Sequence, residues 1–531
     1  MISTRITDDF VHRASFYAMA TGIFKRHALG IALLAVIAPC YFAWTWNAEI
    51  GQLGSDGPNY LMMASHYAHG STGDPVYSDN ATYSRFPPLY PLLLSWCHAA
   101  DDFRRIHAIT TACLILALIA LYAWLFLEGL SPVQATLLAI LFAALPGSWL
   151  AGLTVQSEYL YVFWSLLAIT LLTAYQRSMT INMLFAAAIA ISLATLTRTI
   201  GIALFAPFLL ALSRAPIRQA ALALVVSALP LLIWHLLHRS RISYSDALGF
   251  TYGSDAWGVL RSQLAREIPA MRRGFGGSFL LHTQLGPIAD SLGVLCLVGA
   301  SFRAVQLKPD ALYIFSNLLI LLIWPYPADA QRFLWVLMPM LMAQPLLAFS
   351  TWNGAPVSAR TRQQLTCILA IPVLTMLLPA FSLASDRYRS AAYTELPDAR
   401  IFVSWYGEDR DHAWDVVAIQ TSVLNSLHRI PEHVPADGCV IATRPDLLSY
   451  FGQRRSYFPP LNSVPNPYFD TQLRAHGCHF VFEMSSVDGR YPVSMFPMER
   501  LGDQIDVVLY NTIPDGPTGK SKITSALIKI D

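Results

Sequence analysis

The first apolar run of the chain, residues 29–46 (LGIALLAVIAPCYFAWTW), is followed closely by the turn-forming stretch 53–60 (LGSDGPNY). The run approaches the ~20 residues that an α-helix needs to cross a bilayer. Asp56 lies in the turn, and a second polar motif, residues 83–91 (YSRFPPLYP), follows in the same loop. An acid in a turn and an arginine near two prolines, both beside one membrane span, indicate a functional site at one membrane face.

The composition places the whole chain in the membrane class. Of its 531 residues, 54% are hydrophobic and only 13% are charged. Soluble domains carry about 25% charged residues. The formal net charge of +2 gives no reason to expect nucleic acid as a partner.

Apolar runs predict about eleven transmembrane helices. We expect residues 88–96 to form an additional, interfacial helix. The predicted spans begin near Leu29, Ile106, Pro132, Glu158, Met183, Ile202, Gln219, Gly286, Ala311, Phe333 and Leu365.

The orientation follows from the positive-inside rule. With the N-terminus inside, each predicted cytoplasmic turn except the short one at residues 128–131 carries a positive charge. An odd number of spans then places the first loop (residues 47–105) and the tail outside. The basic residues of the inside turns are Lys25, Arg26, Arg177, Arg214, Arg218, Arg303, Lys308, Arg360 and Arg362.

One predicted outside loop, residues 239–280, departs from the rule because it holds six arginines against three acids. A loop of this length can be translocated despite its charge. It is either an amphipathic helix lying on anionic headgroups or an electropositive rim that gathers an anionic lipid substrate. The sequence leaves both open.

The chain divides into a transmembrane domain, residues 1–381, and a polar α/β tail domain, residues 382–531. Strands are predicted at residues 439–443, 479–484 and 506–511, and helices at 416–428 and 445–451. The fold class is thus an all-α membrane protein with a C-terminal periplasmic α/β domain. Cys439 and Cys478 both lie in this tail, where a disulfide could persist, although sequence separation does not show whether they meet.

No cofactor motif is present in the sequence. It has no Cys-x-x-Cys pair, no Walker-type phosphate loop and no Gly-x-Ser-x-Gly elbow. The absence of these motifs argues against an ATP-driven mechanism, and no metal ligands are predicted.

Several motifs together resemble the C superfamily of glycosyltransferases. They are Asp56 in the first outside loop, the motif at residues 85–91 (RFPPLYP), Ser157-Glu158 at a span start, residues 196–201 (LTRTIG), and Gln331-Arg332-Phe333 followed by residues 337–339 (LMP). The nearest branch is similar to the protein O-mannosyltransferases and the bacterial lipid A aminoarabinose transferases, that is, family 39-like. The resemblance covers about the first 350 residues, and the tail is similar only as an outside domain.

The resemblance implies transfer of a sugar from a polyprenyl-phosphate donor, with inversion, at the outer face of the inner membrane. Asp56 would be the general base for the acceptor hydroxyl. The leaving phosphate would meet Arg85, Arg198 and Arg332. Substrate-binding candidates are Glu158, Tyr60 and Tyr83. No cofactor is required, although a divalent ion shared by Asp56 and the lipid phosphate is an option.

Each of these residues also has a structural interpretation. Asp56 could have a purely structural role, as a cap of the following helix or in an Asx-turn. Arg85 could be an interfacial residue whose charged end reaches water. Arg198 could pair with Glu158 for stability alone. The two prolines after Phe86 rigidify the turn that would position Arg85.

Departures from the family pattern leave the acceptor open. The closest relatives carry a second acid beside the catalytic one, whereas Gly57 follows Asp56 here, and Phe86 stands where a basic residue is expected before the prolines. These differences argue against an aminoarabinose transferase specifically. The acceptor is a lipid, a glycan or a protein, and the sugar is not specified. Alternatives are a polyprenyl-lipid transporter or flippase, a glycan ligase or polymerase, and a scaffold without catalysis.

Overall fold

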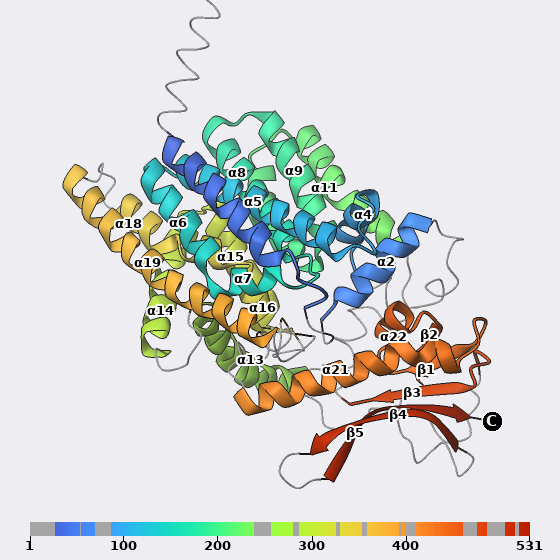
Figure 1. The fold of residues 1–531 in the computed structure, drawn as a ribbon. Helices are drawn as coiled ribbons and strands as arrows, with labels where there is room; N and C mark the ends of the chain where they lie inside the picture. The colour runs from blue at the N-terminus through green and yellow to red at the C-terminus, as the bar shows by residue number, and fades with distance from the viewer. Residues whose placement is uncertain are drawn as a thin grey trace, which may run out of the picture.

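The chain folds into a body of helices followed by a smaller α/β region, which Figure 1 colours from blue to red along the sequence. The structure is a computed structural model of all 531 residues. It describes residues 27–51, 53, 55–69, 86–237, 256–279, 286–324, 330–352, 358–391, 396, 398, 401, 410–459, 475–485, 505–515 and 520–530.

The helical body follows the order of the predicted apolar runs, and every predicted span start lies within one of its helices. After a first helix at His27–Thr45, the elements are α2 (Gly57–His69), α4 (Leu89–Trp96), α5 (Phe103–Leu127), α6 (Pro132–Ala144), α7 (Pro146–Gly152), α8 (Glu158–Ser178), α9 (Ile181–Thr197), η2 (Thr199–Leu204), α10 (Phe205–Leu212), α11 (Ile217–Leu237), α13 (Ala256–Phe279), α14 (Gly286–Val305), α15 (Pro309–Leu322), α16 (Ala330–Trp335), α17 (Met338–Leu341), α18 (Gln344–Trp352) and α19 (Ala359–Ser390).

Within the described residues, six helices are long and apolar enough to cross a membrane. A seventh span results if α6 and α7 are counted together; they are bent by 58° where Pro146 begins α7. The remaining apolar helical segments are shorter: Ile181–Thr197, Thr199–Leu212, Pro309–Leu322 and Met338–Ser350. The chain is therefore a multi-pass helical membrane protein, and the finer count of eleven spans stays a prediction.

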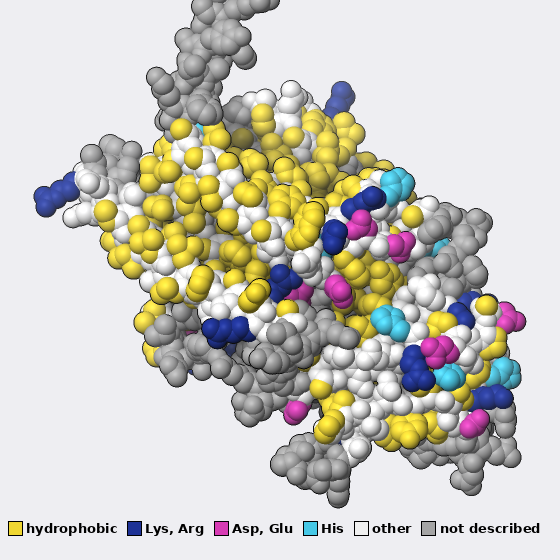
Figure 2. Space-filling view, in the orientation of Figure 1, with side chains coloured by type: hydrophobic (Ala, Val, Ile, Leu, Met, Phe, Trp, Pro, Cys, Tyr) yellow, Lys and Arg dark blue, Asp and Glu magenta, His cyan; other side chains and the backbone are white. Residues whose placement is uncertain are grey.

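The outer faces of several helices are apolar. Leu232 and Leu237 of α11, and Leu378 and Phe381 of α19, are each more than half exposed. Figure 2 shows hydrophobic side chains over much of the helical body, while charged side chains gather nearer the tail. A continuous apolar surface on helices whose backbone groups bond internally is suited to lipid.

A fully buried polar cluster joins the helices of the body. The Arg303 guanidinium bonds to Asp310 at 2.7 and 2.9 Å and lies 3.2 Å from Glu128, while Gln344 donates to Asp310 at 2.8 Å. We call Glu128, Arg303, Asp310 and Gln344 the Arg303 cluster. It connects the end of α5 with α14, α15 and α18.

The tail forms a five-stranded mixed sheet in the order β2-β1-β3-β5-β4. β1 is parallel to β2 and β3, whereas β5 is antiparallel to β3 and β4. The predicted strands and helices are present, but β2 and β5 were not predicted from the sequence. The bounds are α21 (Arg410–His433), β1 (Cys439–Ala442), α22 (Pro445–Gly452), β2 (Arg455–Tyr457), β3 (Phe480–Met484), β4 (Ile505–Asp515) and β5 (Lys520–Ile530).

Cys439 and Cys478 form a disulfide in the tail, which answers the question that the sequence left open. α21 and α22 lie on the side of the sheet that faces the helical body (Figure 1). Leu447 of α22 and Leu61 of α2 belong to one hydrophobic core. The predicted domain boundary at residue 381 lies inside α19, so this helix continues beyond it; the boundary itself stays a prediction.

Candidate active site

Asp56 lies directly before α2, where the sequence Ser-Asp-Gly makes a tight turn. The Ser55 hydroxyl accepts a hydrogen bond from Gly57 N at 3.2 Å, and Asp56 O accepts one from Tyr60 N at 3.2 Å. A Cβ on Gly57 would lie 3.1 Å from Ser55 Oγ and 3.3 Å from Val155, so the turn is packed closely. The Asp56 side chain remains 33% exposed, which leaves it accessible to an incoming group.

Arg332 of α16 contacts Asp56, although the two residues are 276 positions apart in the sequence. Its Nη2 donates to Asp56 Oδ2 at 2.7 Å, and its Nε donates to Glu158 Oε1. α13, the helix inside the predicted basic loop, supports this position because a Cβ on Gly274 would lie only 2.7 Å from the Cα of Gln331. Glycine at this position permits the close approach of α13 to the chain that carries Arg332.

Glu158 is the first residue of α8 and is 2% exposed. Its Oε1 also accepts a hydrogen bond from Arg198 Nη1 at 2.7 Å, so one carboxylate bridges two guanidinium groups. A negative charge at a helix N-terminus is favoured by the helix dipole. The other oxygen, Oε2, is buried and accepts no hydrogen bond within the described part of the chain.

Arg198 follows α9 in an extended conformation, which turns the chain into η2. Its Nη1 lies 3.4 Å from Ser157 Oγ, and its guanidinium lies 5.3 Å from the centre of the Phe333 ring. A Cβ on Gly201 would lie 2.8 Å from Thr195 N, so only glycine permits this sharp change of direction. The Arg198–Glu158 pairing, which the sequence offered as a structural interpretation, is thus present.

Tyr60 completes the buried side of the site. Its hydroxyl forms a 2.9 Å hydrogen bond with Ser157 Oγ, and its ring packs edge-on against Phe86 and Tyr90 of the proline-rich motif. Burial raises the pKa of the Tyr60 phenol above its ordinary value, so it stays a neutral hydroxyl.

The structure thus brings together Asp56, Glu158, Arg198 and Arg332, which we call the Asp56 cluster, with Tyr60 beside it. These residues come from four separate parts of the chain. The remaining candidates, Tyr83 and Arg85, lie outside the described residues, and so do Lys25 and Arg26.

The cluster has balanced charge, with two arginines and two carboxylates. Exchange of one carboxylate for another anion would keep both guanidinium groups paired, and arginine binds phosphate in a bidentate way. Asp56 is the more exposed of the two acids, so it is the one that can be exchanged. Nowhere in the part of the chain that the structure describes do three His, Cys, Asp or Glu side chains form a metal-binding group.

Three tail residues next to the site were missed from the sequence. Arg444 and Asp446, at the start of α22, and Gln420 of α21 contact residues 53, 55 and 59 of the first loop. The short Arg-Pro-Asp sequence at a helix start was a weak local signal. Nothing in the sequence indicated the partners of Arg444, which lie almost 400 positions earlier.

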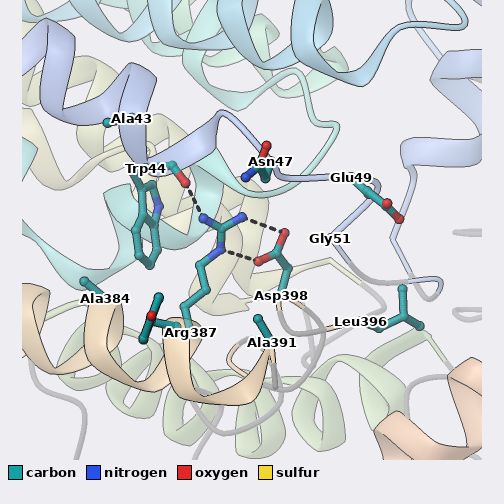
Figure 3. A pocket seen from close by; sticks show the side chains of 11 residues that line it. Ala43, Trp44, Asn47, Glu49, Gly51, Ala384, Arg387, Ala391, Leu396 and Asp398 are labelled. Atoms are coloured by element: carbon teal, nitrogen blue, oxygen red, sulfur yellow. Dashed lines mark hydrogen bonds and ion pairs between the residues drawn. The ribbon is translucent and has the colours of Figure 1, made fainter. Parts of the chain in front are cut away.

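A cavity of about 480 Å³ opens near the predicted outer end of the first helix (Figure 3). Arg387 lies in it, but its guanidinium bonds to Asp398 at 2.6 Å and to the Trp44 carbonyl at 2.5 Å. Asp398 is itself almost buried, at 7% exposure of its side chain. This arginine therefore lacks the exposed, exchangeable partner that Arg332 has.

Comparison with solved structures extends the likeness over nearly the whole chain. The fold is similar to that of ArnT from Cupriavidus metallidurans bound to undecaprenyl phosphate, with a TM-score of 0.52 and 13% identity over 95% of this chain and 98% of that one. The apo structure of ArnT gives a TM-score of 0.48 and 14% identity, over 96% and 98% of the two chains. The sequence matches no protein-family model and no curated protein.

At this low identity the likeness shows the fold alone. The ArnT-like fold bears out the resemblance that the motifs indicated. The similarity also covers the tail, which the motif resemblance did not reach.

Proposed function

We propose that the chain is an integral membrane glycosyltransferase that takes a sugar from a polyprenyl-phosphate donor and transfers it, with inversion, to an envelope acceptor. The observation that carries the proposal is the hydrogen bond from Arg332 to Asp56, beside Glu158 and Arg198. It joins a candidate base to a candidate phosphate-binding group in one site. Two facts support the donor class: the ArnT-like fold, and undecaprenyl phosphate bound to ArnT itself.

In the proposed reaction Asp56 takes the proton of the acceptor hydroxyl as the hydroxyl oxygen attacks the anomeric carbon. The bond between that carbon and the phosphate oxygen breaks, and its electron pair stays on the phosphate. Arg332 and Arg198 balance the charge that develops there, and Arg85 would add a third cation. Attack from the face opposite the phosphate inverts the anomeric centre.

The donor phosphate would replace Asp56 as the partner of Arg332. Glu158 stays bonded to both arginines and keeps their guanidinium groups in place, while Asp56 is released to act as a base. Glu158 Oε2 is buried and has no bond from the described residues, so it would accept a hydrogen bond from a sugar hydroxyl once donor binding opens the site. Tyr60 and Tyr83 would line the same substrate site.

We further propose that the Asp56 cluster and the tail face the periplasm, and that the shorter apolar helices complete about eleven spans. Gln176 near the end of α8 donates to Leu307 O at 3.2 Å, which groups Arg177 with Arg303 and Lys308 at the other end of that helix. The positive-inside rule favours the cytoplasm for this basic end. The disulfide between Cys439 and Cys478 favours an oxidising compartment for the tail.

The direct test compares the wild-type protein with Asp56→Asn in lipid nanodiscs. Radiolabelled polyprenyl-phosphate sugars serve as donors and a membrane extract supplies the acceptor. Asn keeps an oxygen for Arg332 but cannot take a proton, so we expect donor binding to persist and transfer to fall by about 10²–10⁴-fold. The labelled product identifies the acceptor.

A matched control is Asp102→Asn, which alters an exposed acid of the same loop and retains a residue that can cap α5. It should transfer at the wild-type rate. Transfer that survives in Asp56→Asn would refute the assignment of the base. Donor binding without any transfer by the wild type would favour the transporter alternative, and transfer of preassembled glycans would favour a ligase.

A further inference from the structure

The tail domain bonds to the backbone before Asp56 and to a side chain after it. Arg444, at the start of α22, donates from Nη2 to Ser55 O at 3.1 Å and to Leu53 O at 3.4 Å. Its guanidinium also forms a bidentate pair with Asp446, at 2.9 and 2.7 Å. The pair fixes the direction of the guanidinium, so it is presented to the two carbonyl groups in a defined geometry.

Two further contacts hold the same short segment. Asp446 Oδ2 accepts a hydrogen bond from the Asn59 side chain at 3.1 Å, in the first turn of α2. Gln420 of α21 accepts one from Leu53 N at 3.3 Å. Asp446 and Gln420 are both buried, so water competes little for these bonds. Residues 53–59 are therefore tethered before, at and after the turn that carries Asp56.

The tethers and the Asp56 cluster act on different parts of the same segment, residues 53–59. Arg332 and Glu158 belong to the helical body and contact side chains, whereas Arg444 contacts the backbone carbonyl groups that precede Asp56. A displacement of about 1 Å of a catalytic group can lower a rate by about 10²-fold. Loss of the tether would let the carboxylate move without removing any group from the cluster.

We propose that Arg444 is a positioning residue, through which the tail domain holds Asp56 where it can take the acceptor proton. The proposal rests on the function proposed for Asp56. Asp446 orients Arg444 and, through Asn59, ties the start of α2 to the same point. The tail is thus part of the active site and not only an appended domain.

The test measures kcat and donor affinity for Arg444→Ala in nanodiscs. We expect kcat to fall by about 10- to 100-fold, with donor binding within about twofold of the wild type. Arg444→Lys keeps the charge but cannot make the bidentate pair. Its kcat should lie between those of the wild type and Arg444→Ala.

Arg454→Ala is the matched control for loss of an arginine from the same domain. Arg454 also donates to three backbone carbonyl groups, of Val434, Gln453 and Pro431, but all three belong to the tail. It should therefore lower the stability of the tail without lowering kcat. An equal loss of kcat in both variants would show that Arg444 serves only the folding of the tail, and would overturn the proposal.

A double variant separates positioning from other roles. In the Asp56→Asn background, Arg444→Ala should cause no further loss of the residual transfer, because the group that it positions is gone. A full additional loss would overturn the proposal. If Arg444→Ala does not fold, Asn59→Ala is measured in its place. An unchanged kcat in Asn59→Ala would also overturn the proposal.

These outcomes remain distinct from failure of the proposed function. If Asp56→Asn transfers sugar normally, both proposals fall. If Asp56→Asn loses transfer and Arg444→Ala does not, only the positioning role is refuted.

Discussion

The Asp56 cluster and the Arg303 cluster are two arginine–carboxylate groups at opposite ends of α8. Glu158 begins that helix, and Gln176 near its end bonds to Leu307, which follows α14. With a rise of ~1.5 Å per residue, a helix of 21 residues separates the two clusters by about 30 Å. The same chemical groups thus meet in two environments within one bundle.

The two clusters differ in which charged group forms the bridge. At Glu158 one carboxylate bridges two arginines, whereas at Arg303 one arginine bridges two carboxylates. Arg303 and Asp310 have no exposed side-chain surface, while Arg332 retains 13% exposure and Asp56 retains 33%. We propose that an anion replaces Asp56 at Arg332, whereas the closed, net-negative Arg303 cluster offers no such exchange. Similar ion pairs can therefore form a binding site or a structural connection, and exposure with an exchangeable partner distinguishes the two.

Arg303→Ala should have the largest effect. It leaves Glu128 and Asp310 buried without their cation, a change that costs about 3–5 kcal/mol of folding free energy in comparable buried pairs. Thermal unfolding in detergent should show a large loss of stability, with donor affinity unchanged in the fraction that stays folded. The triple variant Arg303→Met, Glu128→Gln, Asp310→Asn should recover much of that loss, and failure to recover would argue against a purely structural role.

Arg332→Gln should show the opposite behaviour. Loss of one preorganised cation opposite a developing charge costs about 2.7–4 kcal/mol of transition-state stabilisation, or about 10²–10³-fold in kcat. Unfolding should change less than in Arg303→Ala, because Asp56 is partly exposed and can be hydrated. The comparison fails if Arg332→Gln destabilises the fold as much as Arg303→Ala while sparing transfer.

Glu158→Gln should have an intermediate effect. The amide oxygen can still accept from one guanidinium, but Arg198 and Arg332 lose their common negative partner. We expect about a tenfold fall in kcat, equivalent to ~1.4 kcal/mol, together with weaker alignment of the donor phosphate. Steady-state kinetics measure both, and a change in the donor KM alone would mean that Glu158 serves donor binding and not the transfer step.

Arg272→Gln should have the smallest effect and provides a baseline. Arg272 of α13 forms a bidentate pair with Asp290, but this pair lies at the surface. Exposed ion pairs contribute little because water screens them. Neither the unfolding temperature nor kcat should change measurably in low or high salt. A loss of donor affinity would instead support the interpretation of the basic loop as a rim that gathers anionic lipid.

Much of the helical body could be predicted because the signals are local. The apolar runs located the helices, and in the tail the β-branched and aromatic runs located β1, β3 and β4. β5 was missed although it pairs with two strands, because its lysines and serines, residues 520–525, make its first half polar. β2 has only three residues, too few for a periodic pattern.

The candidate site was predictable only in its members. Asp56, Glu158, Arg198 and Arg332 were each chosen for charge, position at a span end and motif resemblance. The Arg198–Glu158 pair was offered as a structural interpretation. That Glu158 also bonds Arg332, and that Arg332 holds Asp56, could not be predicted, because these bonds join segments far apart in sequence. The contact of Arg444 with the Asp56 turn was missed entirely for the same reason.

The sequence by itself determined that the chain enters a membrane, where its helices run, and which side chains can carry charge near a membrane face. These properties follow from hydrophobicity and backbone propensity, which act over neighbouring residues. Only the tertiary structure decided which arginine meets which acid, which cluster is closed, and that the tail reaches the Asp56 turn. Pairing and burial depend on distances between helices, and those distances are set by the packing of the whole chain.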